Sequence, residues 1–307
     1  MEFIAGPSDS LAFSMGNGLA SVIRDNSDLT VNIKSGTSSQ AVTLVGRGEA
    51  EMGFSTTLTG IQASQSTGAF EGTDFSQAIL QLPSYYFIRL GGFVKSNTDA
   101  EYFSDLEGKS FGPGPSGTSY WPVFKLALEK ALNLDGLEIV NSSVGRLPDL
   151  LSSGQAFSVG GPTLSNNVIP GFTQQVISQG KVRMLSYRSD VLEAIRDDPT
   201  VPLVDVKKDH FSNVNEFTAD GDTVPMASAN YVAWSSDAVS EDLIYNLYKT
   251  AWENTEALSN VHSSFKLWAS KEWYTQNMTP EVPVHPGAAK FLKEIGVWDD
   301  TYSVGSI

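Results

Sequence analysis

Residues 29–57 read LTVNIKSGTSSQAVTLVGRGEAEMGFSTT, and this stretch decides the fold. It opens on an alternating strand pattern and closes on a second short apolar strand. Between the strands lies a Ser/Gly/Thr loop and then a helical pattern over 40–46, which Ser38 or Ser39 is placed to cap. A strand, a helix and a strand in this order predict a βαβ unit, and therefore a parallel sheet covered by helices.

The same alternation continues in both directions along the chain. An apolar strand at 3–5 precedes a helical pattern over 11–24. Further strands are predicted at 87–90, 92–94, 137–140, 157–159, 182–186 and 228–234, and further helices at 120–132, 243–258 and 288–295. The sequence therefore predicts the α/β class throughout.

The length of 307 residues favours two lobes over one, because single cores stop growing at about 250–300 residues. The strand pattern restarts near residue 90, and a strand at 228–234 is placed to return to the first lobe. We predict a discontinuous lobe I, residues 1–90 plus 225–307, and a lobe II, residues 91–224. A hinge is expected near Gly91 and Gly92 and near Gly221.

Composition excludes several classes of protein. Acidic residues outnumber basic ones, 35 to 20, so a partner nucleic acid is not expected, because phosphate binding needs clustered Lys and Arg. The absence of cysteine excludes disulfides and thiolate metal sites. No apolar run is long enough to span a bilayer, and no signal peptide opens the chain. The sequence leaves a cytoplasmic chain and an exported one without its signal peptide as alternatives.

Catalytic constellations are scarce. The three histidines, His210, His262 and His285, are far apart and lie outside the Ser/Thr/Gly-rich loops that follow the predicted strands. No His-x-x-x-His, paired-carboxylate or Gly-x-Ser-x-Gly signature occurs. We therefore expect no enzyme activity, no metal and no cofactor.

One glycine motif has the spacing of a dinucleotide-binding loop. Residues 112–117 (GPGPSG) have the Gly-x-Gly-x-x-Gly spacing between a predicted strand and a predicted helix. Pro113 and Pro115 remove two of the N–H donors that a pyrophosphate would use. The acid about 20 residues on, Asp135, has no strand before it, which disfavours this interpretation.

Short loops rich in Ser, Thr and Gly follow the predicted strands and precede predicted helices. These loops are 6–10, 35–39, 55–57, 112–119 and 160–163. Ligands in open α/β sheets bind beyond the carboxyl ends of the strands, and helix N-termini favour anions. Ordinary helix caps and turns are the alternative interpretation. From these loops we expect ligand contacts by Ser8, Ser10, Ser39 and Gly161.

Aromatic and arginine residues beside the loops are further candidates. Aromatic rings here form either a ligand wall or part of the core, and the residues concerned are Phe13, Tyr85, Tyr86, Tyr120 and Trp121. We take Phe13 and Trp121 as ligand-binding. Arg89 and Arg146 could pair with a carboxylate through the guanidinium fork, or be ordinary surface residues.

An ordered set of motifs resembles the TAXI family of solute-binding proteins, which serve tripartite ATP-independent periplasmic (TRAP) transporters. The segment 35–40 (SGTSSQ) is similar to the family's Thr-Gly-Gly-Ser loop, and 48–54 (GEAEMGF) to its Gly-Glu-Ala-Asp-x-Gly-Phe segment. Three further matches are 105–109 (DLEGK), 112–118 (GPGPSGT) and 285–288 (HPGA). The resemblance runs over nearly the whole chain.

The resemblance implies a two-lobed periplasmic binding protein (type II-like) with a ligand cleft between lobes. It implies a periplasmic location, a small organic acid such as an amino acid, dicarboxylate or 2-oxo acid, and the membrane subunits of a TRAP transporter as partner. Carried over by position, the implied ligand contacts are Ser38, Ser55, Thr56, Ser116, Gly117 and Thr118.

Departures from the family pattern concern the ligand. Ala12 and Phe13 stand where the family has two tyrosines, Ala41 replaces an Asn and Phe157 replaces an Asp. These changes disfavour glutamate and favour a ligand with a larger apolar part. Two alternatives to transport stay open, a ligand-sensing domain for a signalling partner and an α/β enzyme such as a transferase or a prephenate-dehydratase-like relative.

Overall fold

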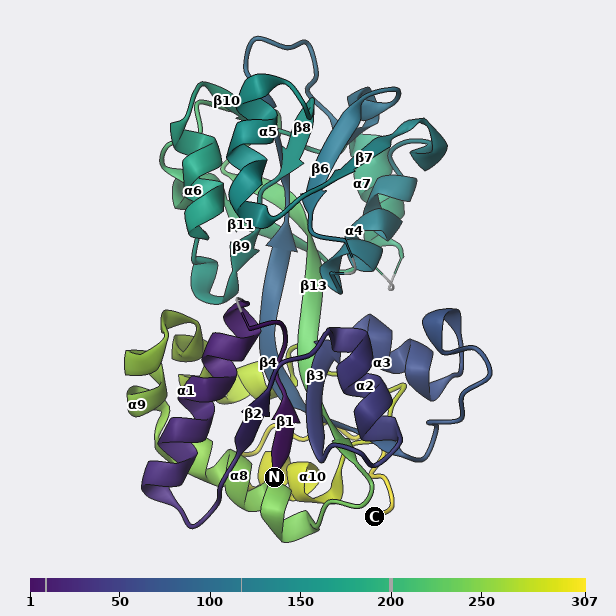
Figure 1. The fold of residues 1–307 in the computed structure, drawn as a ribbon, viewed down its shortest axis with the longest axis vertical. Helices are drawn as coiled ribbons and strands as arrows, with labels where there is room; N and C mark the ends of the chain where they lie inside the picture. Colours follow the sequence, from purple (N-terminus) through teal and green to yellow (C-terminus); the bar gives the residue numbers. More distant parts are fainter. Residues whose placement is uncertain (9, 117, 199–200) are drawn as a thin grey trace. The chain divides into compact units, whose positions relative to one another are not determined.

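A computed structural model describes residues 1–8, 10–116, 118–198 and 201–307, without the side chain of Asn166. The chain forms two compact units, which are coloured by sequence in Figure 1. Unit 1 comprises Met1–Phe87 and Asn230–Ile307, and unit 2 comprises Ile88–Ala229. The chain passes from one unit to the other twice, within strands β4 and β13.

Unit 1 contains a sheet with the order β2-β1-β3-β13-β4. Its strands are β1 (Glu2–Ile4), β2 (Asn32–Lys34), β3 (Met52–Thr56), and the unit 1 parts of β4 (Ile79–Leu90) and β13 (Thr223–Ser236). Strand β1 pairs with β2 and β3 in parallel, while β13 pairs with β3 antiparallel. The predicted parallel sheet is therefore a mixed one, because the returning strand runs the opposite way.

Helices pack against this sheet. They are α1 (Leu11–Asn26), α2 (Ser38–Gly46), α3 (Thr57–Ser64), α8 (Glu241–Glu253), α9 (Thr255–Val261) and α10 (Pro286–Glu294), with 3-10 helices η1 (Gly68–Phe70), η7 (Ser263–Ala269) and η8 (Lys271–Thr275). Helix α1 lies beside β2, and α2 lies beside β3 (Figure 1). Helices α8 and α10 touch where Gly287 approaches Glu241, since a Cβ on Gly287 would lie 2.2 Å from the Glu241 carbonyl oxygen.

Unit 2 contains a six-stranded sheet with the order β12-β10-β5-β8-β6-β7. Its strands are β5 (Gly92–Lys95), β6 (Ser110–Gly114), β7 (Glu138–Asn141), β8 (Ser158–Gly160), β10 (Val182–Met184) and β12 (Glu216–Phe217). Strand β5 runs antiparallel to β8 and β10, while β6 pairs in parallel with β7 and β8. Beside this sheet, β9 (Thr163–Leu164) pairs with β4 and β11 (Leu203–Lys207) pairs with β13.

The helices of unit 2 are short. They are α4 (Tyr120–Glu129), α5 (Leu147–Ser153), α6 (Gly171–Ser178) and α7 (Ser189–Arg196), with 3-10 helices η2 (Phe103–Leu106), η3 (Leu134–Gly136), η4 (Val144–Arg146), η5 (Ser165–Asn167) and η6 (Lys208–Phe211). Helices α5 and α6 lie side by side (Figure 1). Phe93, Val159 and Met184 form the centre of a core that these two helices cover.

Two helix predictions were wrong in detail. The helix predicted over 243–258 is two helices, because Asn254 leaves the helical conformation (φ −121°, ψ 31°) and its side-chain amide donates to the Thr250 carbonyl at 2.8 Å. Helix α2 is capped by Thr37 rather than by Ser38 or Ser39. The Thr37 hydroxyl accepts the Gln40 N–H at 3.3 Å, and the Gln40 side chain accepts the Thr37 N–H at 2.9 Å.

Candidate functional site

Three helices of unit 1 begin at one edge of its sheet. Strands β1, β2 and β3 are parallel, so their carboxyl ends meet at this edge, and α1, α2 and α3 follow them. The N-caps are Ser10, Thr37 and Thr56, each of which accepts a backbone N–H from the first turn. The remaining N–H groups of a helix start carry partial positive charge, which favours an anion.

The first two loops of this edge are joined to each other. The Gly36 N–H donates to the Gly6 carbonyl at 3.1 Å. Gly6 has a φ of +97°, and a Cβ there would lie 2.7 Å from the Ser10 hydroxyl and 3.1 Å from the Phe54 ring. A side chain at position 6 is thus excluded both by backbone conformation and by space. This contact fixes the two loops relative to each other.

Ser55 is the most unusual polar residue of the edge. It is fully buried in β3, and its hydroxyl has no hydrogen-bond partner among the described residues. Its neighbour Thr56 is also buried, but the Thr56 and Thr59 hydroxyls lie 2.7 Å apart and satisfy each other. Buried hydroxyls are normally hydrogen-bonded, so Ser55 has spare capacity for a ligand.

The other candidates from unit 1 differ in exposure. Ser8 and Ser39 are exposed, Ser38 is 7% exposed, and Phe13 is half-buried in the first turn of α1. Ser10 is held by two local bonds, because its hydroxyl donates to the Pro7 carbonyl at 2.6 Å and accepts the Phe13 N–H at 3.2 Å. The structure thus places these residues at the start of α1 and α2.

Tyr85 and Tyr86 belong to an aromatic cluster in the core of unit 1. The Tyr85 hydroxyl donates to the Ala12 carbonyl at 3.1 Å, and burial raises the pKa of its phenol. The Tyr86 ring stacks on the Tyr231 ring with centroids 4.3 Å apart. The Phe54 ring lies beside the Tyr85 ring and the Tyr231 ring, with centroids 6.1 Å and 5.7 Å away, respectively. Core packing accounts for these contacts.

The candidates of unit 2 follow β6 and β8 at the carboxyl edge of the second sheet. Ser116 is exposed, and Thr118 and Trp121 are half-buried at the start of α4, while Gly117 lies outside the described residues. Trp121 stacks on the Phe111 ring at 6.1 Å. The Tyr120 hydroxyl donates to the Pro113 carbonyl at 3.0 Å, and burial raises the pKa of this phenol.

Gly161 has a packing reason to be glycine. A Cβ at this position would lie 1.9 Å from the Phe93 ring, and the Gly161 N–H donates to the Gly91 carbonyl at 3.0 Å. A cavity of about 10 Å³ lies here, lined by Leu90, Gly91, Phe111, Pro113, Tyr120, Phe124, Gly160, Gly161, Pro162 and Phe172. It has room for about one water molecule, so it does not by itself hold an organic ligand.

The two arginine candidates occupy different environments. Arg146 is exposed in η4 after β7. Arg89 is only 4% exposed, and burial lowers the pKa of its guanidinium to about 10. Arg89 therefore keeps its positive charge at neutral pH inside the protein. It pairs across the sheet with Thr163, a residue of the predicted loop 160–163 that the sequence did not single out.

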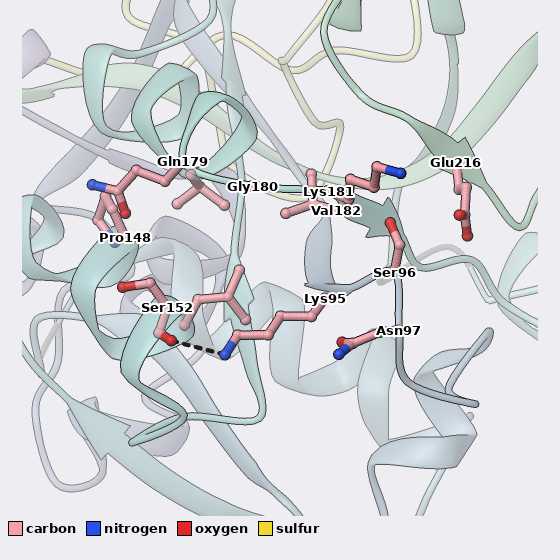
Figure 2. Close-up of a pocket in the computed structure, with 12 residues that line it drawn as sticks. Lys95, Ser96, Asn97, Pro148, Ser152, Gln179, Gly180, Lys181, Val182 and Glu216 are labelled. Atoms are coloured by element: carbon pink, nitrogen blue, oxygen red, sulfur yellow. Dashed lines mark hydrogen bonds between the residues drawn. The ribbon is translucent and has the colours of Figure 1, made fainter.

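One hollow of unit 2 lies at the opposite edge of its sheet. It measures about 500 Å³ and is lined by residues such as Lys95, Ser96, Lys181 and Glu216, which Figure 2 shows. Lys95 ends the antiparallel strand β5, so this hollow lies away from the carboxyl ends of β6 and β8. The Lys95 ammonium donates to the Ser152 carbonyl at 2.8 Å. Ligands of such sheets bind at the other edge, so we do not assign the ligand here.

Two of the three histidines, His262 and His285, hold backbone groups. His285 is buried, accepts the Gly287 N–H on Nδ1 at 3.1 Å and donates from Nε2 to the Val239 carbonyl at 2.9 Å. His262 accepts the Ser264 N–H at 3.1 Å. His210 lies 3.7 Å from the Asp209 carboxylate at the surface. Within the described ranges, no group of three or more His, Asp or Glu residues is placed to bind a metal ion.

None of the helices in the part of the chain that the structure describes is long and apolar enough to cross a bilayer.

Comparisons with known proteins give both a family and a fold. The model of the NMT1-like family matches residues 3–296. No curated protein sequence matches the chain.

Three solved structures superimpose with a TM-score of 0.50. XAC2383 from Xanthomonas citri, bound to chloride ion, is 10% identical, with 95% of each chain covered. The periplasmic aliphatic sulphonate binding protein SsuA from Escherichia coli is 13% identical over 95% of this chain and 78% of that one. PhnD1 from Prochlorococcus marinus, in complex with methylphosphonate, is 11% identical over 87% of this chain and 89% of that one. The similarity confirms the predicted α/β, two-lobed periplasmic binding protein fold.

Proposed function

The chain belongs to the NMT1-like family, and on this basis we propose that it is an extracytoplasmic solute-binding protein. It captures a small organic acid and delivers it to a membrane transporter. The fold shared with SsuA and PhnD1 supports a binding role. The histidines support it as well, because His262 and His285 hold backbone groups rather than a nucleophile.

The observation that carries the proposal is the carboxyl edge of the unit 1 sheet. Three helix N-termini begin there, and a fully buried serine hydroxyl, Ser55, has no partner among the described residues. Aligned peptide dipoles and hydroxyl donors stabilise an oxyanion without a cluster of positive charges. This matches a chain with an excess of 15 acidic residues over basic ones.

Several classes of acid fit such a donor set. SsuA is an aliphatic sulphonate binding protein, and PhnD1 was solved with methylphosphonate. Carboxylates, sulfonates and phosphonates each present at least two acceptor oxygens on one charged group, so each can accept from several donors. We favour a carboxylate, on the motif resemblance of residues 35–40 and 112–118, and we include the other two classes in the test.

We propose a TRAP-type secondary transporter as the partner. The support is the ordered set of TAXI-like segments, of which 48–54 and 285–288 are examples. The second of these segments has a structural role, because His285 caps α10 and Gly287 allows α10 to touch α8.

Ligand-induced stabilisation tests the binding proposal. We expect one class among amino acids, dicarboxylates, 2-oxo acids, aromatic acids, sulfonates and phosphonates to raise the melting temperature. A ligand at 100 times its Kd should add about 2.7 kcal/mol to the free energy of unfolding. The measurement is a thermal-shift screen followed by calorimetric titration of each hit. A flat result across the whole panel would contradict the proposal.

Ser55→Ala links that ligand to the site. Removing a hydroxyl that has no hydrogen-bond partner among the described residues should leave the melting temperature of the free protein nearly unchanged. The variant should bind the hit at least several-fold more weakly, because a donor to the acid is lost. The matched control is Ser104→Ala, since the Ser104 hydroxyl in η2 is also buried without a partner among the described residues. Equal affinity for both variants would remove Ser55 from the site.

A further inference from the structure

Arg89 is a cation that unit 2 buries. It lies near the end of β4 and is 4% exposed. Burying a charged group is unfavourable, and here it lowers the pKa of the guanidinium to about 10. That value is still well above neutral pH, so the positive charge remains. Among the described residues no other Arg or Lys is buried.

Thr163 lies directly opposite Arg89. The two residues are Cα partners in the antiparallel pairing of β4 with β9. Directly opposed residues point to the same face of a sheet, with Cβ atoms about 4.5–5.5 Å apart. The guanidinium of Arg89 and the hydroxyl of Thr163 therefore share one face of unit 2.

The Thr163 hydroxyl is fully buried and has no hydrogen-bond partner among the described residues. A nearby residue shows that this is not the rule in this region. Thr173 is equally buried, and its hydroxyl donates to the Pro162 carbonyl at 3.3 Å. Valine has nearly the same shape as threonine and would fill position 163 without an unsatisfied polar atom. The Thr163 hydroxyl is therefore a hydrogen-bonding group that is not required for packing at this position.

We propose that Arg89 and Thr163 bind one singly charged acid group of the ligand. This inference rests on the proposed function and narrows it to monoanions, such as a monocarboxylate or a sulfonate. A carboxylate or sulfonate accepts from the guanidinium fork through two oxygens and from the threonine hydroxyl at the same time. Arg89 also has contacts within the protein, and a guanidinium, with five N–H donors, can bind an anion in addition to such contacts.

The ligand is expected to carry one negative charge because unit 2 buries one cation among the described residues. A second carboxylate on the ligand would find no second buried cation to pair with, because Arg89 is the only Arg or Lys that is buried among the described residues. Without such a cation the second charge loses hydration and gains no ion pair. We therefore expect monoanions to bind and the corresponding dianions to bind more weakly.

Gly161 and Gly91 hold the Thr163 strand in place. The Gly161 N–H donates to the Gly91 carbonyl at 3.0 Å, two residues from both members of the pair. A Cβ on Gly91 would meet the Met184 methyl at 2.6 Å, so this backbone is packed closely against the core. The register between Arg89 and Thr163 is thus fixed before any ligand arrives.

The test is calorimetric titration of the full chain with matched probes. Acetate, benzoate and methanesulfonate represent monoanions, acetamide and benzamide are neutral counterparts, and succinate is a dianion. We expect at least one monoanion to bind, and its neutral counterpart and succinate to bind at least tenfold more weakly. Arg89→Met should lower the affinity for that monoanion on the order of 100-fold, and Arg89→Lys should recover part of it.

Thr163→Val separates ligand binding from structural support. It should weaken the binding of the same monoanion about 5- to 10-fold, while the melting temperature of the free protein stays equal or rises. The matched control, Thr218→Val, removes another buried hydroxyl without a described partner and should leave affinity unchanged. Arg24→Met removes an exposed charge from unit 1 and should also leave it unchanged.

Each outcome decides a separate statement. Wild-type binding of a monoanion with equal affinity for Thr163→Val and Arg89→Met would overturn this site and leave the proposed function standing. Equal binding of the neutral amide, or tighter binding of succinate, would overturn the monoanion assignment. No binding of any probe in this titration or of any acid in the wider thermal-shift panel would overturn both proposals.

Discussion

At the scale of single residues, His285 makes the fold sensitive to acid. Its Nδ1 accepts the Gly287 N–H at the start of α10, which only the neutral ring can do. Burial is the main cause that lowers the pKa of this imidazole below 6.5. The unfolded chain therefore binds a proton more readily than the folded one. The stability that His285 contributes is complete above pH 6.5 and is lost as the pH falls below it.

We predict a decline in the free energy of unfolding between pH 6.5 and roughly 5, before most carboxylates titrate. His285→Asn keeps a capping acceptor without a titrating ring, and should flatten this decline at some cost in stability at pH 7. Urea unfolding at several pH values measures both. Burial also lowers the pKa of His262, so part of the slope should remain. His210→Asn is the control, and a wild-type slope in His285→Asn would contradict the assignment.

The sequence shows where hydroxyl residues lie, but not whether their hydroxyls find hydrogen-bond partners in the folded chain. Ser55 and Thr56 are adjacent hydroxyl residues, and nothing in their order shows that only Thr56 finds a partner, Thr59. Thr163 was missed as a candidate because threonine is ordinary in strands. Its interest depends on the register with Arg89, which joins positions 74 residues apart and is fixed by tertiary pairing.

At the scale of elements, the cap of α2 gives a direct test. Thr37 and Gln40 satisfy each other's backbone N–H groups in a capping box. Thr37→Ala should lower the free energy of unfolding by about 1 kcal/mol, since the Gln40 N–H loses its acceptor, the Thr37 hydroxyl. Ser39→Ala is the matched control, because Ser39 is exposed in the first turn and does not cap. Chemical denaturation of both variants decides between Thr37 and Ser39 as the cap.

The lengths of β4 and β13 could be predicted only in part from the sequence, because each strand contains a proline near its start. The sequence predicted strands at 87–90 and 228–234, whereas β4 begins at Ile79 and β13 at Thr223. Pro83 and Pro225 interrupt the strand pattern, because proline lacks a donor and normally sits at sheet edges. Here Pro225 is opposite Asp205 of the short strand β11, where the pairing tolerates it. Local rules could not show that tertiary packing continues both strands past a proline.

At the scale of the whole molecule, a transport assay distinguishes a TRAP-type partner from an ATP-driven transporter. Purified chain should support uptake of the identified acid into proteoliposomes that hold the membrane subunits of a TRAP transporter. An imposed Na⁺ gradient should drive that uptake without ATP. The control is the Ser55→Ala variant at a concentration that leaves the site largely unfilled. Uptake that requires ATP, or that occurs equally without the chain, would contradict a TRAP-type partner.

The α/β class with two lobes was open to prediction, because alternating strand and helix patterns and chain length both report on it. The mixed direction of the sheets was not. Strand β5 and strand β13 run against their neighbours, and the direction of a strand depends on where the chain returns in space. The family match and the shared fold confirm the predicted class.

The insertion of unit 2 within unit 1 also has a consequence for biosynthesis. Residues 1–87 emerge from the ribosome with β3 still lacking its neighbour β13, which belongs to unit 1 only from Asn230 onward. At about 5–20 residues per second, the intervening 88–229 take roughly 7–30 s to translate. Unit 2 can complete its own sheet during this interval, while the nascent N-terminal segment has an unprotected strand edge. Cotranslational chaperones would therefore be needed more by residues 1–87 than by unit 2.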